Sequence, residues 1–125
     1  MARNQISVVD DDESVRRTTK LLIESSGYQA AAFESAENLF NSGQLDDTSC
    51  LIIDVRMPRM NGLQLQSHLA AAGSRISIIF ITAYEDNESR RRAMQAGAVA
   101  FLTKPFEPAD LLAAVSRALS GGSQG

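Results

Sequence analysis

Short apolar runs alternate with segments of helical period along the whole chain. Four runs are rich in Ile and Val, carry apolar residues at consecutive positions, and span residues 6–9, 50–53, 76–82 and 98–103. Strands of this kind are typically covered on both faces, as in a parallel sheet. A weaker fifth strand is predicted at 28–33, where small residues suit the edge of a sheet.

A segment of helical length follows each predicted strand, and its ends carry recognisable signals. Gly27 suits the left-handed backbone that follows a helix, and Ser35 can accept hydrogen bonds from the first exposed N–H groups of the next one. Pro108 is a favoured first-turn residue. The predicted helices cover residues 14–26, 36–43, a segment after Asn61-Gly62, 86–96 and a segment that begins at Pro108.

This order of strand and helix, repeated five times, predicts an α/β fold. Right-handed crossovers leave few topologies, and the simplest is a single doubly wound (βα)5 domain. Its five-stranded parallel sheet has the order 2-1-3-4-5, the flavodoxin-like arrangement, and binds ligands beyond the carboxyl ends of strands 1 and 3. The domain is predicted to span residues 1–119, and the small residues of 120–125 have the composition of a flexible tail or linker.

Composition and charge restrict the function of the chain. The 125 residues fit one domain, and 44% of them are apolar, which is enough for a core. A net charge of −3 gives no general electrostatic reason to bind nucleic acid or an anionic membrane surface. Because the sequence has neither a run long enough to span a membrane nor a secretory signal, we expect a cytoplasmic location.

The single cysteine and the single histidine carry no recognisable chemistry. Cys50 has no partner for an internal disulfide, and with only His68 beside it the sequence offers no zinc site. Cys50 lies in an apolar run and is interpreted as a buried thiol. His68 lies among polar and small residues and is interpreted as a surface side chain.

Acidic residues gather where two neighbouring strands are predicted to end. Asp10, Asp11 and Asp12 follow the first strand, and Asp54 ends the third. Two carboxylates about 4 Å apart repel by about 4 kcal/mol at an effective dielectric of about 20. A positive charge must therefore offset the repulsion.

Lys104 and a hard divalent cation are the two candidates for that charge. Lys104 lies at the end of the fifth predicted strand, and Mg²⁺ favours sites with carboxylate, carbonyl and phosphate oxygens. Thr82 ends the fourth strand, where its hydroxyl can donate a hydrogen bond to an incoming oxyanion. Together these residues indicate phosphate chemistry.

Four motifs in the predicted order carry a family resemblance. The stretches VVDDDESVR, IIDVRMPRMNGLQL, FITAYED and AGAVAFLTKPF resemble the receiver (phosphoacceptor) domain of bacterial two-component response regulators. The resemblance covers residues 4 to 119. The helix openings and loops are most similar to the FixJ-like branch of receivers.

The resemblance implies an aspartyl phosphate site. Asp54 would accept a phosphoryl group from a histidine of a sensor kinase or from a small acyl phosphate. Asp11 would bind Mg²⁺ directly and Asp10 mainly through water, while the backbone carbonyl of Arg56 would supply a further ligand; Mn²⁺ can substitute. Such a domain is not a conventional enzyme: it catalyses its own phosphorylation and slow dephosphorylation.

The resemblance also implies a switch and a set of partners. Lys104 and Thr82 would bind the phosphoryl oxygens, and Phe101 would swing inward as Thr82 moves. The expected readout surface is helix 4, strand 5 and helix 5, which would control a DNA-binding output domain outside this chain or form a homodimer. The arginines in SRRR at 89–92 are either a solvated helical face or part of that contact.

Three finer expectations concern residues near the acidic cluster. Asp12 is interpreted as the cap of the first helix, because a carboxylate there binds exposed N–H groups. The resemblance implies a cis peptide bond between Lys104 and Pro105. Arg56 and Tyr84 occupy positions that are thought to set the lifetime of the phosphoryl group in receivers.

Three alternatives remain open from the sequence. A phosphatase similar to haloacid dehalogenases needs a second carboxylate two residues after its nucleophile, where this chain has Arg56. An inert pseudo-receiver would act only as a protein-binding module. A nucleotide-binding flavodoxin-like protein would need a glycine-rich loop after the first strand, and none is present.

Overall fold

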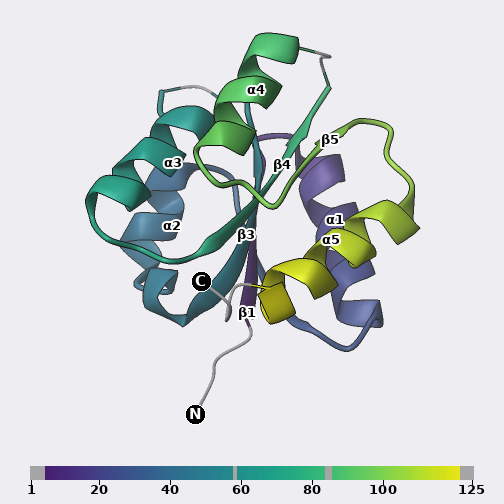
Figure 1. The fold of residues 1–125 in the computed structure, drawn as a ribbon. Coiled ribbons are helices and arrows are strands. Elements are labelled where there is room, and N and C mark those ends of the chain that lie inside the picture. The colour runs from purple at the N-terminus through teal and green to yellow at the C-terminus, as the bar shows by residue number, and fades with distance from the viewer. Residues whose placement is uncertain (1–4, 58, 84–85, 122–125) are drawn as a thin grey trace.

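The computed structural model describes residues 5–57, 59–83 and 86–121 of the chain. Within them, strands and helices alternate as the sequence predicts (Figure 1). The strands are β1 Gln5–Val9, β2 Gln29–Phe33, β3 Thr48–Asp54, β4 Ser77–Thr82 and β5 Ala100–Thr103. The helices are α1 Glu13–Ser25, α2 Ala36–Ser42, the short 3₁₀ helix η1 Leu45–Asp47, α3 Gly62–Ala71, α4 Asn87–Gln95 and α5 Pro108–Gly121.

The five strands form one parallel sheet in the order β2-β1-β3-β4-β5, so the predicted fold class is confirmed. The weak strand β2 lies at an edge, as its small residues indicate. The register places Val9 beside Ile53 and Thr82 beside Thr103. Parallel strands in this register bring the residues that follow β1, β3, β4 and β5 to one end of the sheet.

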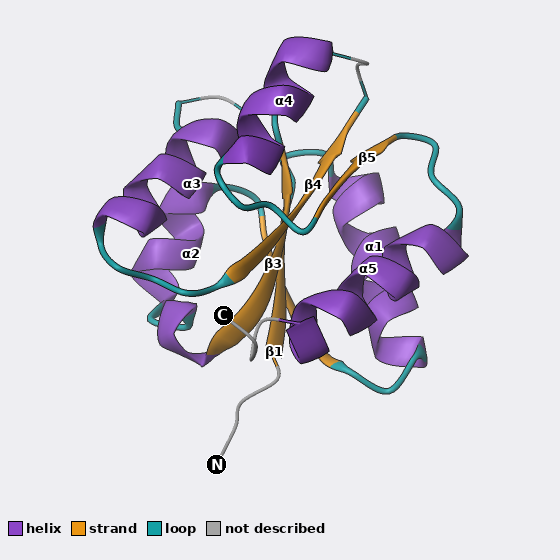
Figure 2. Ribbon diagram, viewed as in Figure 1, coloured by secondary structure: helices purple, strands orange, loops and turns teal. Residues whose placement is uncertain are grey.

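Helices cover both faces of the sheet (Figure 2). Helices α1 and α5 pack on one face, where Ile23 and Leu111 join inward residues of the strands. Helices α2, α3 and α4 pack on the other, where Leu39, Leu65 and Ala93 do the same. Helices cover both faces of each central strand, so apolar residues occupy consecutive positions instead of alternating with polar ones. This pattern made the strands recognisable in the sequence.

Side-chain caps begin the helices where the sequence predicts them. The carboxylate of Asp12 accepts hydrogen bonds from the N–H groups of Ser14 and Val15 at the start of α1, so its predicted capping role is confirmed. Ser35 caps α2. Asn61 and Gln64 form a reciprocal pair of side-chain to backbone hydrogen bonds, both 2.9 Å long, at the start of α3.

Some element boundaries differ from the prediction. Strand β3 begins at Thr48, whose hydroxyl lies 2.6 Å from the hydroxyl of Ser7 on β1, so a polar pair extends the ladder beyond the apolar run. Strand β5 begins only at Ala100, because the N–H of Ala98 bonds to Ala93 in the preceding helix. Helix α5 begins at Pro108, as predicted, and continues through Gly121.

The one cysteine and the one histidine of the chain lie in the environments that the sequence predicts. Cys50 is fully buried, and burial raises the pKa of its thiol to about 12. His68 is exposed and packs its ring against Phe40 at a centroid distance of 5.4 Å. Neither contributes to a polar cluster in the described part of the chain.

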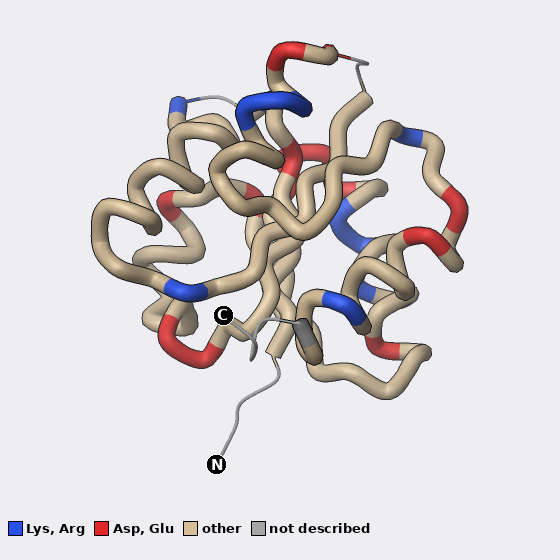
Figure 3. The backbone as a smooth tube through the Cα atoms, in the orientation of Figure 1, with Lys and Arg blue, Asp and Glu red and all other residues tan. Residues whose placement is uncertain are grey.

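Charged residues are unevenly distributed over the fold (Figure 3). Acidic residues gather at the carboxyl end of the sheet, and basic residues of α4 lie at the same end of the molecule. Among the described residues, no helix combines the length and the hydrophobicity that a membrane crossing requires.

Candidate functional site

Three carboxylates meet at the carboxyl end of the sheet. Asp10 follows β1 and is fully buried, Asp54 ends β3 and is 6% exposed, and Asp11 is exposed. Each of the three offers a carboxylate oxygen within 4.8 Å of the others. The expected convergence is therefore observed, and it follows from the adjacency of two parallel strands.

Lys104 lies between the two buried carboxylates. Its Nζ atom is 3.1 Å from Oδ2 of Asp10 and 3.0 Å from Oδ2 of Asp54. The backbone holds the lysine in place, because its N–H donates a 2.7 Å hydrogen bond to the carbonyl of Thr82. The peptide bond from Lys104 to Pro105 is cis, as the resemblance implies.

The second oxygen of each buried carboxylate accepts a backbone hydrogen bond. The N–H of Asp12 donates to Oδ1 of Asp10, and the N–H of Arg56 donates to Oδ1 of Asp54, each over 2.9 Å. Each carboxylate is thus oriented by one N–H group and one ammonium. This fixed orientation is what a reacting or metal-binding carboxylate requires.

Burial and charge pairing act in opposite directions on the pKa values of Asp10 and Lys104. Burial raises the pKa of Asp10, although the Asp12 N–H and the Lys104 ammonium oppose this effect. For Lys104, burial works to lower the pKa, but the hydrogen bond and charge of Asp54 and the charge of Asp10 outweigh it and the pKa is raised. Three carboxylates share one ammonium, so the cluster favours a further cation.

The donor set of the cluster fits a hard divalent cation. All three side chains offer carboxylate oxygens, within reach of one another, and one of them faces solvent. Mg²⁺ binds through one or two carboxylates and keeps several water molecules, which a partly open oxygen site allows. Neither cysteine nor histidine belongs to the cluster, so its chemistry does not fit a soft metal.

Thr82 and Phe101 lie on the two strands beyond β3. Thr82 ends β4 and is 1% exposed, and Phe101 on β5 is 5% exposed. The ring of Phe101 packs against Phe80 at a centroid distance of 6.0 Å. The ring is thus already buried in this structure, and its predicted inward movement stays a prediction.

Gly62 allows the start of α3 to lie close to the backbone at the end of β3. Its N–H donates a 3.0 Å hydrogen bond to the carbonyl of Val55. A Cβ atom at Gly62 would lie 2.7 Å from the carbonyl oxygen of Asp54 and 2.9 Å from the ring of Phe80, so a larger residue cannot fit without displacing them. The pair Asn61-Gly62 therefore both caps α3 and permits this approach.

Arg16 contributes to the site and was not singled out from the sequence. Its guanidinium donates a 2.7 Å hydrogen bond to the backbone carbonyl of Asp10. The sequence does show an arginine in the first turns of a helix that follows an acidic run. It does not show which way the Arg16 side chain points, because that direction depends on how α1 packs beside β1.

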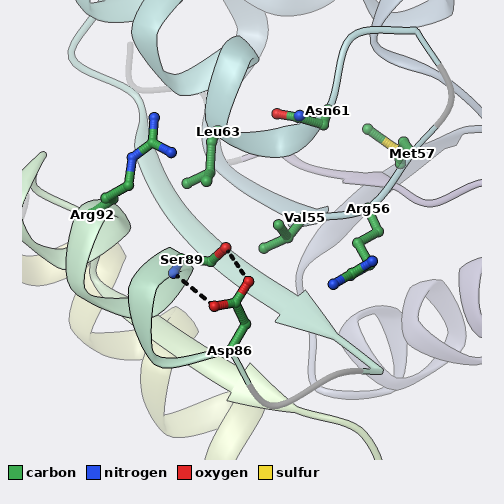
Figure 4. A pocket seen from close by; sticks show the side chains of 8 residues that line it. All are labelled: Val55, Arg56, Met57, Asn61, Leu63, Asp86, Ser89 and Arg92. Carbon is green, nitrogen blue, oxygen red and sulfur yellow. Dashed lines mark hydrogen bonds between the residues drawn. The ribbon is translucent and has the colours of Figure 1, made fainter.

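A groove of about 510 Å³ lies between the loop after β3 and helix α4 (Figure 4). The side chain of Arg56 points into it on the side where Asp86 caps α4. Hydrogen bonds from Ser89, and to a smaller degree the charge of Arg56, hold the pKa of Asp86 below its ordinary value. Tyr84, the expected companion of Arg56, lies outside the described residues. The groove is lined by Val55, Arg56, Met57, Asn61, Leu63, Asp86, Ser89 and Arg92.

The chain matches the family model of the response regulator receiver domain over residues 6–116. It therefore belongs to the receiver domain family of two-component response regulators, and the family prediction is confirmed. Receiver domains as a class take phosphate from histidine kinases and are not conventional enzymes.

Curated relatives agree with this assignment. The chain is 46% identical over 110 residues to nodulation protein W of Bradyrhizobium diazoefficiens, covering 88% of this chain and 48% of that protein. It is 37% identical over 119 residues to the transcriptional regulatory protein FixJ of Azorhizobium caulinodans, covering 95% and 56%. The chain thus spans about half the length of the curated relatives it matches.

Solved structures give the same fold. The response regulator StyR matches with a TM-score of 0.87 and 40% identity over 98% of this chain and 62% of that one. The structure titled FixJ-N matches with a TM-score of 0.84 and 34% identity, over 96% of both chains. The similarity to FixJ proteins agrees with the expected FixJ-like branch.

Proposed function

We propose that the domain accepts a phosphoryl group on Asp54, from a phosphohistidine of a sensor histidine kinase, and thereby switches a signalling surface. The observation that carries this proposal is the pairing of Asp54 with Lys104 at 3.0 Å inside a cluster of three carboxylates. This arrangement gives one carboxylate a fixed direction and places beside it an ammonium that can neutralise phosphoryl oxygens.

In the proposed reaction, a carboxylate oxygen of Asp54 forms a bond to phosphorus while the bond from phosphorus to the donor breaks. The donor atom is the histidine nitrogen of the kinase, which takes up a proton, or the acyl oxygen of a small acyl phosphate, which leaves as a carboxylate. Lys104 stabilises the negative charge on the transferring group. Attack of water on the aspartyl phosphate later reverses the modification, slowly.

The fit of the acidic cluster supports a role for Mg²⁺. Asp11 and Asp54 would bind it directly, Asp10 mainly through water, and the backbone carbonyl of Arg56 would add a ligand; Mn²⁺ can take its place. When bound, the ion supplies positive charge that offsets the charge of the phosphoryl oxygens.

The proposed response runs through Thr82, Lys104 and Phe101 to α4, β5 and α5. Phosphorylation adds up to one further negative charge and three strong acceptor oxygens. Moving a two-state equilibrium from 1:99 to 99:1 takes about 5.5 kcal/mol. Charge-assisted hydrogen bonds contribute about 1.5–3 kcal/mol each, so about two to four of them supply that amount.

The partners proposed for the domain follow from this role. A sensor histidine kinase would supply the phosphoryl group, and an output domain or partner would read the surface formed by α4, β5 and α5. The relatives, which are about twice as long as this chain, support an output domain outside it. The proposed location is the cytoplasm. Neither nucleic acid nor a membrane is a proposed direct partner.

Mass spectrometry after treatment with acetyl phosphate and Mg²⁺ tests the proposal. The wild type should gain the mass of one phosphoryl group, and Asp54→Asn should gain nothing. Omitting the metal by adding EDTA should abolish the gain. A gain in both proteins would show a different acceptor, and no gain in either would favour the inert pseudo-receiver.

Sedimentation of the treated and untreated forms tests the proposed homodimer. The treated protein should associate more tightly through the α4, β5 and α5 surface, where Arg91 and Arg92 are exposed. Equal sedimentation of both forms would contradict phosphorylation-dependent dimerisation while leaving phosphoryl transfer intact.

A further inference from the structure

Helix α4 is attached to the rest of the domain by few buried contacts. Ala93 is its one fully buried residue among those described, and a 3.1 Å hydrogen bond from Gln66 to the Ala93 carbonyl ties it to α3. Elements with few buried contacts are the ones that move most easily. Each remaining contact of α4 therefore has a large effect on its position.

Arg90 makes a side-chain contact from α4 to β5, which lies beside it (Figure 1). Its Nη1 atom donates a 3.1 Å hydrogen bond to the backbone carbonyl of Phe101. The guanidinium carbon also lies 5.0 Å from the centroid of the Phe101 ring, within the range of a cation–π interaction. One side chain thus contacts both the backbone and the ring of the same residue.

The Phe101 ring also has an aromatic contact within the core. Phe80, which is fully buried, packs against it at 6.0 Å, and the ring is only 5% exposed. The ring thus contacts both an arginine from α4 and an aromatic residue from β4. Loss of the arginine side chain removes the first of these contacts and leaves the second in place.

We infer that Arg90 is a positioning residue for Phe101. Arg90 keeps the Phe101 ring in its buried position and makes α4 and β5 move together. Arg90 contacts the backbone carbonyl and the ring of Phe101, and it acts on the proposed switch through that residue. The link from Phe101 to the phosphoryl group rests on the proposed function, but the hold of Arg90 on the ring does not.

Fluorine NMR of protein that contains 4-fluorophenylalanine measures the ring position directly. The sequence has five phenylalanines, and the signal of Phe101 is the one that disappears in Phe101→Leu. The shift difference between H₂O and D₂O reports exposure of the ring. The measurement uses unphosphorylated protein, so it is independent of Asp54 chemistry.

Arg90→Gln should raise the ratio of exposed to buried ring about tenfold, because it removes both the cation over the ring and the charged donor. Arg90→Lys should have a smaller effect, since it keeps the charge. Arg117→Gln is the matched control: Arg117 donates a hydrogen bond of the same 3.1 Å length to the nearby Val99 carbonyl but comes from α5. An equal ring signal in Arg90→Gln, Arg117→Gln and wild type would overturn the inference.

Titration with beryllofluoride and Mg²⁺, a mimic of the phosphoryl group, separates this inference from the proposed function. If the ring is coupled to the site, Arg90→Gln should change the apparent affinity by the factor by which it changes the population of the ring state that binds the mimic. A shifted ring with unchanged affinity would support the hold by Arg90 and contradict the proposed switch. Absence of beryllofluoride binding in wild type would contradict the proposed function and leave the ring result standing.

Discussion

Replacing Lys104 by methionine tests how strongly the acidic cluster depends on its internal cation. Methionine keeps much of the side-chain length and removes the charge. Lys104 Nζ lies 3.0 and 3.1 Å from two carboxylates, and the three side chains are 18%, 9% and 0% exposed. The substitution leaves both carboxylates close together without their shared partner.

The loss of stability expected for Lys104→Met depends more on the burial of the charged groups than on the distances between them. At an effective dielectric of about 20, each contact provides a gross attraction of about 5 kcal/mol, most of which offsets desolvation. Removing one partner of a buried pair costs about 3–5 kcal/mol, and partial exposure of Lys104 reduces this to about 2–3 kcal/mol. With a urea slope of about 1–3 kcal/mol per molar, the unfolding midpoint should fall by about 0.7–3 M.

Urea unfolding followed by circular dichroism in EDTA measures this loss. Lys20→Met is the matched control, because Lys20 forms a shorter contact of 2.7 Å with Glu24, but both side chains are more than a third exposed. The control should lose less than about 0.5 kcal/mol. Added Mg²⁺ should stabilise Lys104→Met more than wild type, since the variant cluster lacks its own cation. Equal losses in Lys104→Met and Lys20→Met would refute the electrostatic reasoning.

Three further outcomes follow from single contacts. Gly62→Ala should lower the free energy of unfolding by about 1–3 kcal/mol, because the new Cβ would lie 2.7 Å from the Asp54 carbonyl. Urea unfolding measures this loss, and an unchanged stability would mean that the loop relaxes freely. Asp12→Ala should cost about 1 kcal/mol through loss of its two cap hydrogen bonds, while phosphorylation by acetyl phosphate is retained; loss of phosphorylation in a folded variant would place Asp12 in the site. Burial raises the pKa of the Cys50 thiol to about 12, so the thiol stays protonated in the folded protein at pH 9, where an exposed thiol ionises. Iodoacetamide at pH 9 should therefore modify Cys50 only in urea. Rapid modification of the native protein would show that the strand opens.

Much of the fold was predictable because its signals are local. Continuous apolar runs identify strands that are buried on both faces, and capping residues such as Asp12 and Ser35 identify helix starts. The boundaries of β3 and β5 were not predictable in the same way. Thr48 extends its strand through a hydroxyl pair with Ser7, and Ala98 leaves its strand because its N–H bonds to Ala93.

The carboxylates and the lysine of the site were predictable because strand ends of a parallel sheet converge. Asp10, Asp54 and Lys104 each follow or end a strand, so the strand order alone brings them together. The contacts of Arg16 and Arg90 were not predictable. Both depend on the direction of a long side chain across a helix-to-strand packing, which sequence spacing does not determine.

The central claim is that the cluster directs phosphoryl transfer to one particular carboxylate. Borohydride reduces an aspartyl phosphate to homoserine, so treatment with acetyl phosphate and Mg²⁺, reduction and tandem mass spectrometry locate the modified residue. The account predicts homoserine at position 54, in the presence of Mg²⁺ and not in EDTA. Homoserine at position 10, 11 or 12, or equal labelling with and without the metal, would contradict it.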